Sequence, residues 1–356
     1  MALPIILAGA AAVAAAVGGK KAYDGYQKKS EADEIIEGSK SRYDKRENEI
    51  EALNKVSAQK LDRLGSLELN IGKSFGEFKK ISDELLKQLK QKDNKDLTLS
   101  IPKCEIDKIE KYSFSTVEFL GTAVASGAAG AAASFAVYSG VMAFAAASTG
   151  TPIAALSGVA AYNATMAAIG GGSLAAGGWG MAGGAMVLGA AAIAPMIAIG
   201  GFAYDSYAEK ALEKAKETRY EVDKAITRMD LIDKHLSNIN NYADKIYTSL
   251  EKINQTFNEY FSALKELHQK IVVLGWGEDI SDNSEKSLRI INNGYLLAAI
   301  MTDIITTPLF KIKKVSEDGI VEVEKDSDEF NVLNQEELDN VLINKEKEYK
   351  DFILGV

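Results

Sequence analysis

Residues 222–271 read VDKAITRMDLIDKHLSNINNYADKIYTSLEKINQTFNEYFSALKELHQKI. Their apolar residues recur at alternating steps of three and four with one slip, which places them on one helical face as a sustained heptad seam. The seam consists of Val222, Ile226, Met229, Ile232, Leu236, Ile239, Ala243, Ile246, Leu250, Ile253, Phe257, Tyr260, Leu264, Leu267 and Ile271. A helix over residues 205–272 would be roughly 100 Å long at 1.5 Å per residue. Such a helix cannot bury its stripe alone, so the sequence predicts a second long helix beside it.

Residues 23–91 supply a matching stripe in a highly charged context. Apart from a longer step between Val56 and Leu61, its spacings are again three and four. It consists of Ile50, Leu53, Val56, Leu61, Leu64, Leu67, Ile71, Phe75, Phe78, Ile81, Leu85 and Leu89. Gly65, Gly72 and Gly76 interrupt this helix and indicate kinks or close helix contacts. We expect the two arms to pair in an elongated, mainly α bundle; coiled-coil oligomerisation is the alternative use of the same stripes.

The charge of the chain is divided very unevenly. Its 356 residues carry 41 Lys+Arg and 50 Asp+Glu, a net charge of -9. Residues 119–204, the uncharged segment, contain no Asp, Glu, Lys, Arg or His, and more than half of these residues are Ala or Gly. The acidic balance argues against nucleic-acid binding, which needs clustered Lys and Arg. A single cysteine, Cys104, excludes an intramolecular disulfide framework.

The uncharged segment is predicted to hold two or three hydrophobic helices, with small residues repeating every fourth position. Such stripes let helix backbones approach closely inside a bilayer. The predicted insertion and packing residues are Gly121, Ala125, Ala129, Ala133, Gly172, Ala176, Gly180 and Gly184. An uncharged surface of this size would exceed the apolar patch that a soluble protein tolerates. We therefore expect either membrane insertion, the favoured interpretation, or permanent burial under the charged arms.

The two ends of the chain add smaller elements. Residues 3–19 are apolar and precede Lys20 and Lys21, which fits an anchor, a signal peptide or a buried helix. Near the C-terminus, Asp318-Gly319 predicts the turn of a small β-hairpin, and Asn334 with Glu337 predicts a capping box for a last helix. The predicted domains are an apolar segment (1–21), an amphipathic arm with a linker (22–116), the glycine-zipper segment (117–204), the heptad helix (205–275) and an acidic helix and hairpin region (276–356).

No motif indicates catalysis, a cofactor or a metal. Gly72-Lys73-Ser74 lacks the glycine spacing of a phosphate-binding loop and lies within a helical stripe. His235 and His268 would lie about 50 Å apart along one helix and cannot share a metal. Cys104 falls in a predicted linker. We therefore predict a protein that is not an enzyme.

Amphipathic arms around a central uncharged segment resemble the α-helical pore-forming toxins of the cytolysin A and haemolysin BL type. The resemblance covers residues 22–272 and is architectural; it implies a helical stalk whose hydrophobic hairpin inserts after a conformational change. Residues 1–4 (MALP) and 155–184 (ALSGVAAYNATMAAIGGGSLAAGGWGMAGG) are also similar to uncharacterised bacterial glycine-zipper proteins. The chain departs from secreted toxins because no basic region precedes its first apolar run, and its uncharged centre is longer than a two-helix tongue.

These observations predict a membrane-perturbing protein that inserts into a lipid bilayer as a homo-oligomer or with related subunits. We expect it to be membrane-associated, soluble before insertion, and either in the bacterial cytoplasm or delivered by contact rather than secreted. The alternative is a non-enzymatic scaffold, anchored or soluble, whose coiled-coil arms bind protein partners.

Overall fold

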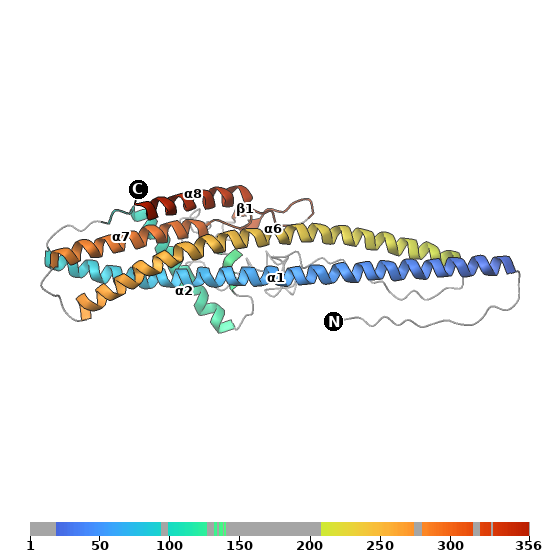
Figure 1. Cartoon of the computed structure of the whole chain (residues 1–356), viewed down its shortest axis with the longest axis horizontal. Helices are drawn as coiled ribbons and strands as arrows, with labels where there is room; N and C mark the ends of the chain where they lie inside the picture. The colour runs from blue at the N-terminus through green and yellow to red at the C-terminus, as the bar shows by residue number, and fades with distance from the viewer. Residues whose placement is uncertain are drawn as a thin grey trace. The chain divides into compact units, whose positions relative to one another are not determined.

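The computed structural model describes residues 19–93, 99–126, 132–133, 135–137, 139, 208–273, 280–315, 321–328 and 330–355. These residues are mainly helical, and their long helices pack together, which confirms the mainly α fold and the helical bundle (Figure 1). The chain divides into two compact units. The smaller unit comprises Met1–Lys55 and Ala190–Ser237, and the larger unit comprises Val56–Gly189 and Asn238–Val356.

Two long helices contribute residues to both units: α1 (Gly19–Asp93) and α6 (Ala208–His268). They correspond to the two predicted stripes, and a π-helical turn, η4 (Gln269–Val273), follows α6. The stripe of α1 differs from the prediction in one turn, because Val56 is 42% exposed whereas Ser57 is buried. Ser57 lies four residues before Leu61, so it restores the regular spacing that the longer step had broken.

Within the smaller unit, α1 and α6 run parallel. Arg42 pairs with Asp223 at 2.8 Å, and Arg46 pairs with Asp230 at 2.9 Å, so the partner numbers rise together along both helices. A small apolar cluster accompanies these ion pairs; it consists of Tyr43, Val222, Ala225 and Met229.

The larger unit shows the same direction. Lys60 forms an ion pair with Asp244, and further along both helices Glu84 Oε2 lies 2.7 Å from His268 Nε2. Periodicity predicts which face of a helix is buried but says nothing about direction. The parallel orientation is therefore a finding that only the structure supplies.

Aromatic side chains fill the core of the larger unit. The ring of Phe78, on α1, lies 5.3 Å from that of Phe257 and 5.8 Å from that of Phe261, both on α6. It also makes an edge contact of 5.1 Å with Tyr295, on α7 (Ile280–Ile305). A Cβ added at Gly294 would lie only 2.2 Å from the Phe78 ring, so glycine makes room for this ring on α7.

Helix α2 (Lys103–Ser126) begins earlier than the sequence predicts. Cys104 was expected in a linker, but it lies in the first turn of α2 and is exposed, so that prediction is wrong. Pro102 directly precedes the helix, where a missing backbone N–H costs nothing. Charged residues separate the apolar residues of this stretch in the sequence. In the structure these apolar residues form one face of α2, on which Ile109 and Tyr112 are buried.

Glycines on α1 let α2 approach closely. A Cβ at Gly72 would lie 2.2 Å from Thr116 Oγ1, and one at Gly76 would lie 2.7 Å from Ser113 Oγ. As the partner numbers rise on α1 they fall on α2, so α2 runs back along α1. Of the two interpretations of these glycines, close helix contact is thus confirmed.

Helix α7 packs against α2 and against α8 (Gln335–Leu354) (Figure 1). Tyr242 of α6 donates a 2.8 Å hydrogen bond to Asp339 Oδ2, and the rings of Tyr260 and Phe352 lie 5.8 Å apart. One hydrogen bond and one aromatic contact thus hold α8 against α6.

Two short strands, β1 (Ile312–Val315) and β2 (Val321–Val323), pair antiparallel where the sequence predicts a hairpin. The predicted turn residues Asp318 and Gly319 lie outside the described residues. Backbone hydrogen bonds then join Lys311 to Val332 and Val332 to Glu324. The segment before α8 thereby extends this small patch of β structure.

The predicted capping box at α8 is wrong. The Asn334 side chain makes no hydrogen bond to the backbone of the first turn. Its amide Nδ2 donates instead to the carbonyl oxygen of Pro308 at 3.2 Å and to the Glu337 carboxylate. The side chain thus ties the start of α8 to the chain that leaves α7, a tertiary contact that a local motif cannot reveal.

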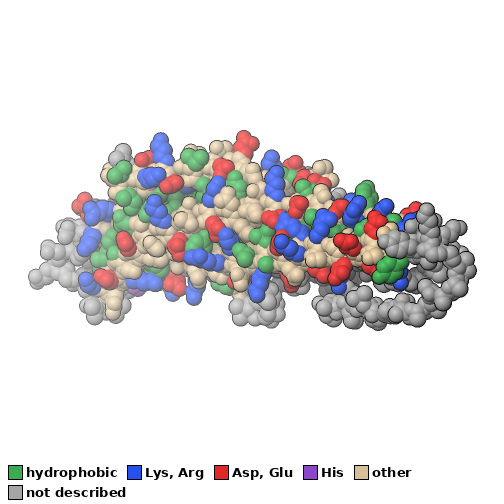
Figure 2. Space-filling view, turned by 45° about the vertical axis from the view of Figure 1, so that its right-hand side comes forward, with side chains coloured by type: hydrophobic (Ala, Val, Ile, Leu, Met, Phe, Trp, Pro, Cys, Tyr) green, Lys and Arg blue, Asp and Glu red, His purple; other side chains and the backbone are tan. Residues whose placement is uncertain are grey.

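The charged faces of the helices carry both signs. Figure 2 shows Lys and Arg side chains interspersed with Asp and Glu across the visible face, with hydrophobic side chains between them. Interspersed opposite charges are typical of solvated helix surfaces.

Candidate functional site

Residues of the uncharged segment that follow α2 contact α1 in the larger unit. Residues 132–133, 135–137 and 139 are helical, and Ala133, Phe135, Ala136 and Val137 are buried. We call the residues that make this contact the docking cluster: Gly65 and Glu68 of α1, Tyr112 of α2, and Ala132 and Ser139 of the uncharged segment. They lie where charged and uncharged parts of the chain meet.

Gly65 permits the closest approach in the cluster. A Cβ added at this position would lie 1.7 Å from the backbone oxygen of Ala132. A backbone atom cannot move aside as the end of a flexible side chain can, and glycine is the residue that lets two backbones approach so closely. The position therefore admits no larger residue while the segment is docked.

Glu68 lies one turn further along α1 and is only 2% exposed. Its Oε2 is 3.0 Å from Ser139 Oγ, and the same Oγ is 3.3 Å from the backbone oxygen of Ile305, the last residue of α7. The Tyr112 hydroxyl donates a 2.7 Å hydrogen bond to the backbone oxygen of Glu68. The cluster therefore joins α1, α2, α7 and the uncharged segment.

The environment of Glu68 disfavours a negative charge. Burial raises the pKa of the Glu68 carboxyl well above its usual range, and the Ser139 hydrogen bond only partly opposes this shift. Burial likewise raises the pKa of Tyr112. Among the described residues, no Lys, Arg or His forms an ion pair with Glu68.

Aromatic rings close the other side of the cluster. Phe135 lies 4.8 Å from Phe119 and 6.3 Å from Tyr112, measured between ring centroids. All three rings are buried. Phe135 is thus packed against α2 by aromatic contacts, in addition to the contacts of Ser139.

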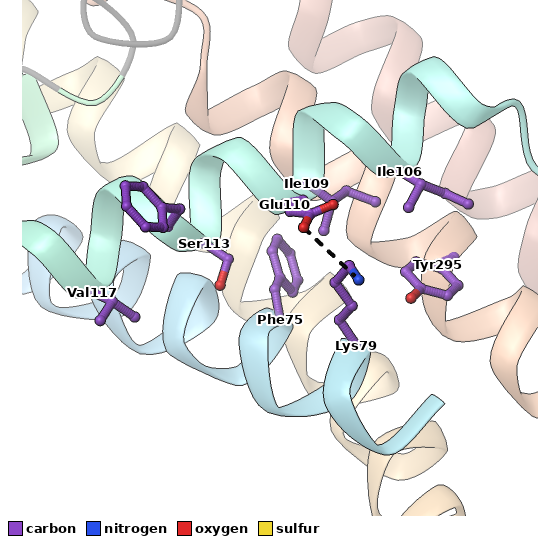
Figure 3. Close-up of a pocket in the computed structure, with 9 residues that line it drawn as sticks. Phe75, Lys79, Ile106, Ile109, Glu110, Ser113, Val117 and Tyr295 are labelled. Atoms are coloured by element: carbon purple, nitrogen blue, oxygen red, sulfur yellow. Dashed lines mark ion pairs between the residues drawn. The ribbon is translucent and has the colours of Figure 1, made fainter. Parts of the chain in front are cut away.

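A small pocket lies nearby, between α1, α2 and α7 (Figure 3). Its volume is about 230 Å³, and Figure 3 shows Phe75 and Tyr295 on its walls and the Lys79–Glu110 ion pair, 3.9 Å long, across it. Small-molecule sites usually occupy roughly 300–1,000 Å³. We therefore assign no ligand to it.

The structure reaches only some of the predicted insertion residues. Gly121 is exposed, and a Cβ there would meet nothing within 4 Å. Ala125 lies in α2, and Ala133 is buried in the core. Ala129, Gly172, Ala176, Gly180 and Gly184 lie outside the described residues, as does the apolar run of residues 1–18.

Sequence reasoning missed Glu68, although a signal for it exists. Glu68 lies four residues after Leu64 and three before Ile71, so its spacing places it on the buried stripe of α1. A carboxylate within an otherwise apolar stripe is the sequence feature that could have identified Glu68 as a buried acidic residue. Ser139 carries no comparable signal, because it is one of several small polar residues in the uncharged segment.

Among the described helices, one has the length and apolar composition to cross a membrane. It covers Ser284–Ile305 of α7, has a mean hydropathy of 1.2, and is 61% buried in the protein. Much of this helix therefore serves as core of the larger unit.

The chain matches no protein-family model, and comparisons with curated proteins and with solved structures also found no match.

Proposed function

We propose that this protein is membrane-active and inserts its Ala/Gly-rich helices into a lipid bilayer as an oligomer. The observation that carries the proposal is the run of 86 consecutive residues, 119–204, without a single charged side chain. Charged residues are costly in hydrocarbon, whereas small residues at every fourth position favour helix packing there. The protein acts through these helices and not through a catalytic group.

The docking cluster supports a role for α1 as a shield. It holds Ala132 and Ser139 through the close approach at Gly65 and the Glu68–Ser139 hydrogen bond, and aromatic contacts of Phe135 lie beside it. Insertion then requires these contacts to open, and the docked and released states differ by a few kcal/mol, as two-state elements do. The charged faces of α1 and α6 keep the docked form soluble.

Dye release from liposomes tests the proposal. Full-length protein is expected to release dye, and Gly180→Leu with Gly184→Leu should abolish release while leaving solubility and helical content unchanged. Gly38→Leu is the matched control, because Gly38 is exposed and a Cβ there meets nothing within 4 Å. Folded protein that releases no dye at any concentration or pH would overturn the proposal.

A second function, a non-membrane scaffold, is favoured by one observation. Ala133, Phe135, Ala136 and Val137 are buried in the bundle as ordinary core residues. If the whole uncharged segment were permanent core, the Gly180→Leu and Gly184→Leu changes would abolish folding instead of dye release. The same two variants therefore separate the two functions.

A further inference from the structure

We propose that Glu68 carries a proton while Ala132 and Ser139 are docked on α1, and that loss of this proton to water releases them. Only the effect of this release on a membrane rests on the proposed function. The protonation and the docking can both be measured in the absence of lipid.

The geometry around Ser139 favours an additional proton. Its Oγ lies within hydrogen-bond distance of two acceptors, Glu68 Oε2 and the Ile305 carbonyl oxygen. A serine hydroxyl has one proton and can satisfy only one of them. A neutral Glu68 resolves this, because its O–H donates to Ser139 Oγ and Ser139 donates to Ile305. That carbonyl belongs to the last turn of α7, where backbone oxygens lack partners within the helix.

The surroundings offer little compensation for a charged Glu68. From α2 the Tyr112 hydroxyl faces it but donates to the Glu68 backbone oxygen rather than to the carboxyl group. On the side of the uncharged segment, the Glu68 carboxyl contacts the Ser139 hydroxyl. On the side of α7, the Ile305 carbonyl oxygen lies beyond that hydroxyl. Among the described residues no cation reaches this carboxyl, and an uncompensated buried charge is strongly unfavourable.

The sign of the pH effect follows from this arrangement. The docked state holds the proton tightly, whereas in the released state the carboxyl returns to its ordinary pKa near 4.5. Docking is therefore strongest in acid. The docking equilibrium weakens by about tenfold per pH unit as pH rises from the ordinary pKa towards the raised one.

Two measurements on the soluble protein test the proposal. Infrared difference spectra should show the C=O stretch of a protonated carboxyl at pH values above the ordinary glutamate pKa, and this band should be absent from Glu68→Gln. Hydrogen exchange of peptides spanning residues 132–139, corrected for the intrinsic pH dependence, should lose protection as pH rises. In Glu68→Gln, whose amide mimics the neutral acid in shape, protection should persist into alkaline buffer.

Asp62→Asn is the matched control, because Asp62 is an exposed carboxylate on the same stretch of α1. It should keep both the infrared band and the pH-dependent exchange. Absence of the band in the wild type, or equal pH dependence of exchange in the wild type and Glu68→Gln, would overturn the proposal. The wild-type data alone can do so, even if a variant fails to fold.

Liposome leakage separates this inference from the function on which it rests. Alkaline release of residues 132–139 without leakage would support the Glu68 switch and overturn membrane activity. Leakage with the same pH dependence in the wild type and Glu68→Gln would support membrane activity and overturn the switch.

Discussion

At Gly65 the structure leaves no space for the methyl group of an alanine. We expect Gly65→Ala to destabilise the larger unit by about 1–3 kcal/mol, because the added Cβ would overlap the Ala132 backbone and force the two segments apart. Urea unfolding followed by circular dichroism measures this change.

The control for this variant is Gly38→Ala, on the same helix. No atom lies within 4 Å of a Cβ at Gly38, so alanine brings only its better helix propensity, and stability should rise by up to about 1 kcal/mol. Equal effects of the two substitutions would show that Ala132 does not pack on Gly65.

Phe78 is a second residue whose loss should be severe. It is 1% exposed and contacts aromatic rings from both α6 and α7. Phe78→Ala should lower the free energy of unfolding by about 3–5 kcal/mol, since it leaves a cavity among rings that cannot collapse into it. Thermal and urea unfolding would measure the loss, and a change below 1 kcal/mol would contradict the packing described here.

Arg46 connects α1 to α6 in the smaller unit. Its guanidinium reaches Asp230 and Asp233 on α6, at 2.9 and 2.7 Å, and Glu49 on its own helix at 2.9 Å. Arg46→Lys should cost about 1 kcal/mol, because an ammonium group cannot reproduce the planar fork that spans these carboxylates.

The Arg46→Lys effect should shrink in high salt, which screens exposed pairs. Lys45→Ala removes an exposed neighbouring cation and should have almost no effect on stability. Urea unfolding at low and high ionic strength provides the comparison; a salt-independent loss would count against an electrostatic role.

The attachment of α8 to α6 should depend on pH through Asp339. The hydrogen bond from Tyr242 holds the pKa of Asp339 below its ordinary value of 3.8, and Lys245 adds to this effect. The carboxylate therefore contributes stability above that ordinary value, and the contribution disappears as pH falls through the lowered pKa.

Asp339→Asn should consequently melt at a lower temperature than the wild type at neutral pH but not in strong acid. Asp351→Asn, a change in the last turns of the same helix, is the control. Melting temperatures measured across the acid range would refute this if the gap between Asp339→Asn and the wild type were the same at every pH.

Elements with long, regular stripes were predictable from the sequence, and those that depend on tertiary partners were not. The apolar seam of α6 repeats over more than ten helical turns, so a single irregular position does not change which face is predicted to be buried. Helix α2 was placed too late because charged residues separate its apolar positions. The Asn334 cap was wrong because the side-chain amide is oriented by donating from Nδ2 to the carbonyl oxygen of Pro308, a residue distant in sequence.

The candidate site was predictable only in outline. The glycines of α1 indicated a close contact, but the sequence did not identify Ala132 or Thr116 as the partners. The position of Glu68 in the apolar stripe indicates a buried residue, whereas its carboxylate is typical of a surface residue. The residue type was given more weight, and Glu68 was therefore left out of the predicted stripe. Its raised pKa arises from burial, which exists only once the helices are assembled.

The proposed function requires a soluble form of the protein that precedes insertion. Full-length protein should therefore purify without detergent and sediment as a smaller species than it does after addition of liposomes and detergent extraction. Analytical ultracentrifugation of both samples provides the test. Protein that is extracted from cells only with detergent would show that no such soluble form exists.

The parallel direction of α1 and α6 also has a consequence for how the chain is made. Lys60 and Asp244 are 184 residues apart, so pairing these helices requires the closure of a very long loop. At the usual 5–20 residues per second, a ribosome needs about 10–40 s to produce the partner after the α1 residue has emerged. During that interval the apolar stripe of α1 has no α6 to cover it, and contacts of such separation form slowly even afterwards. Newly made chains should therefore depend on chaperones for longer than a bundle of adjacent antiparallel helices would.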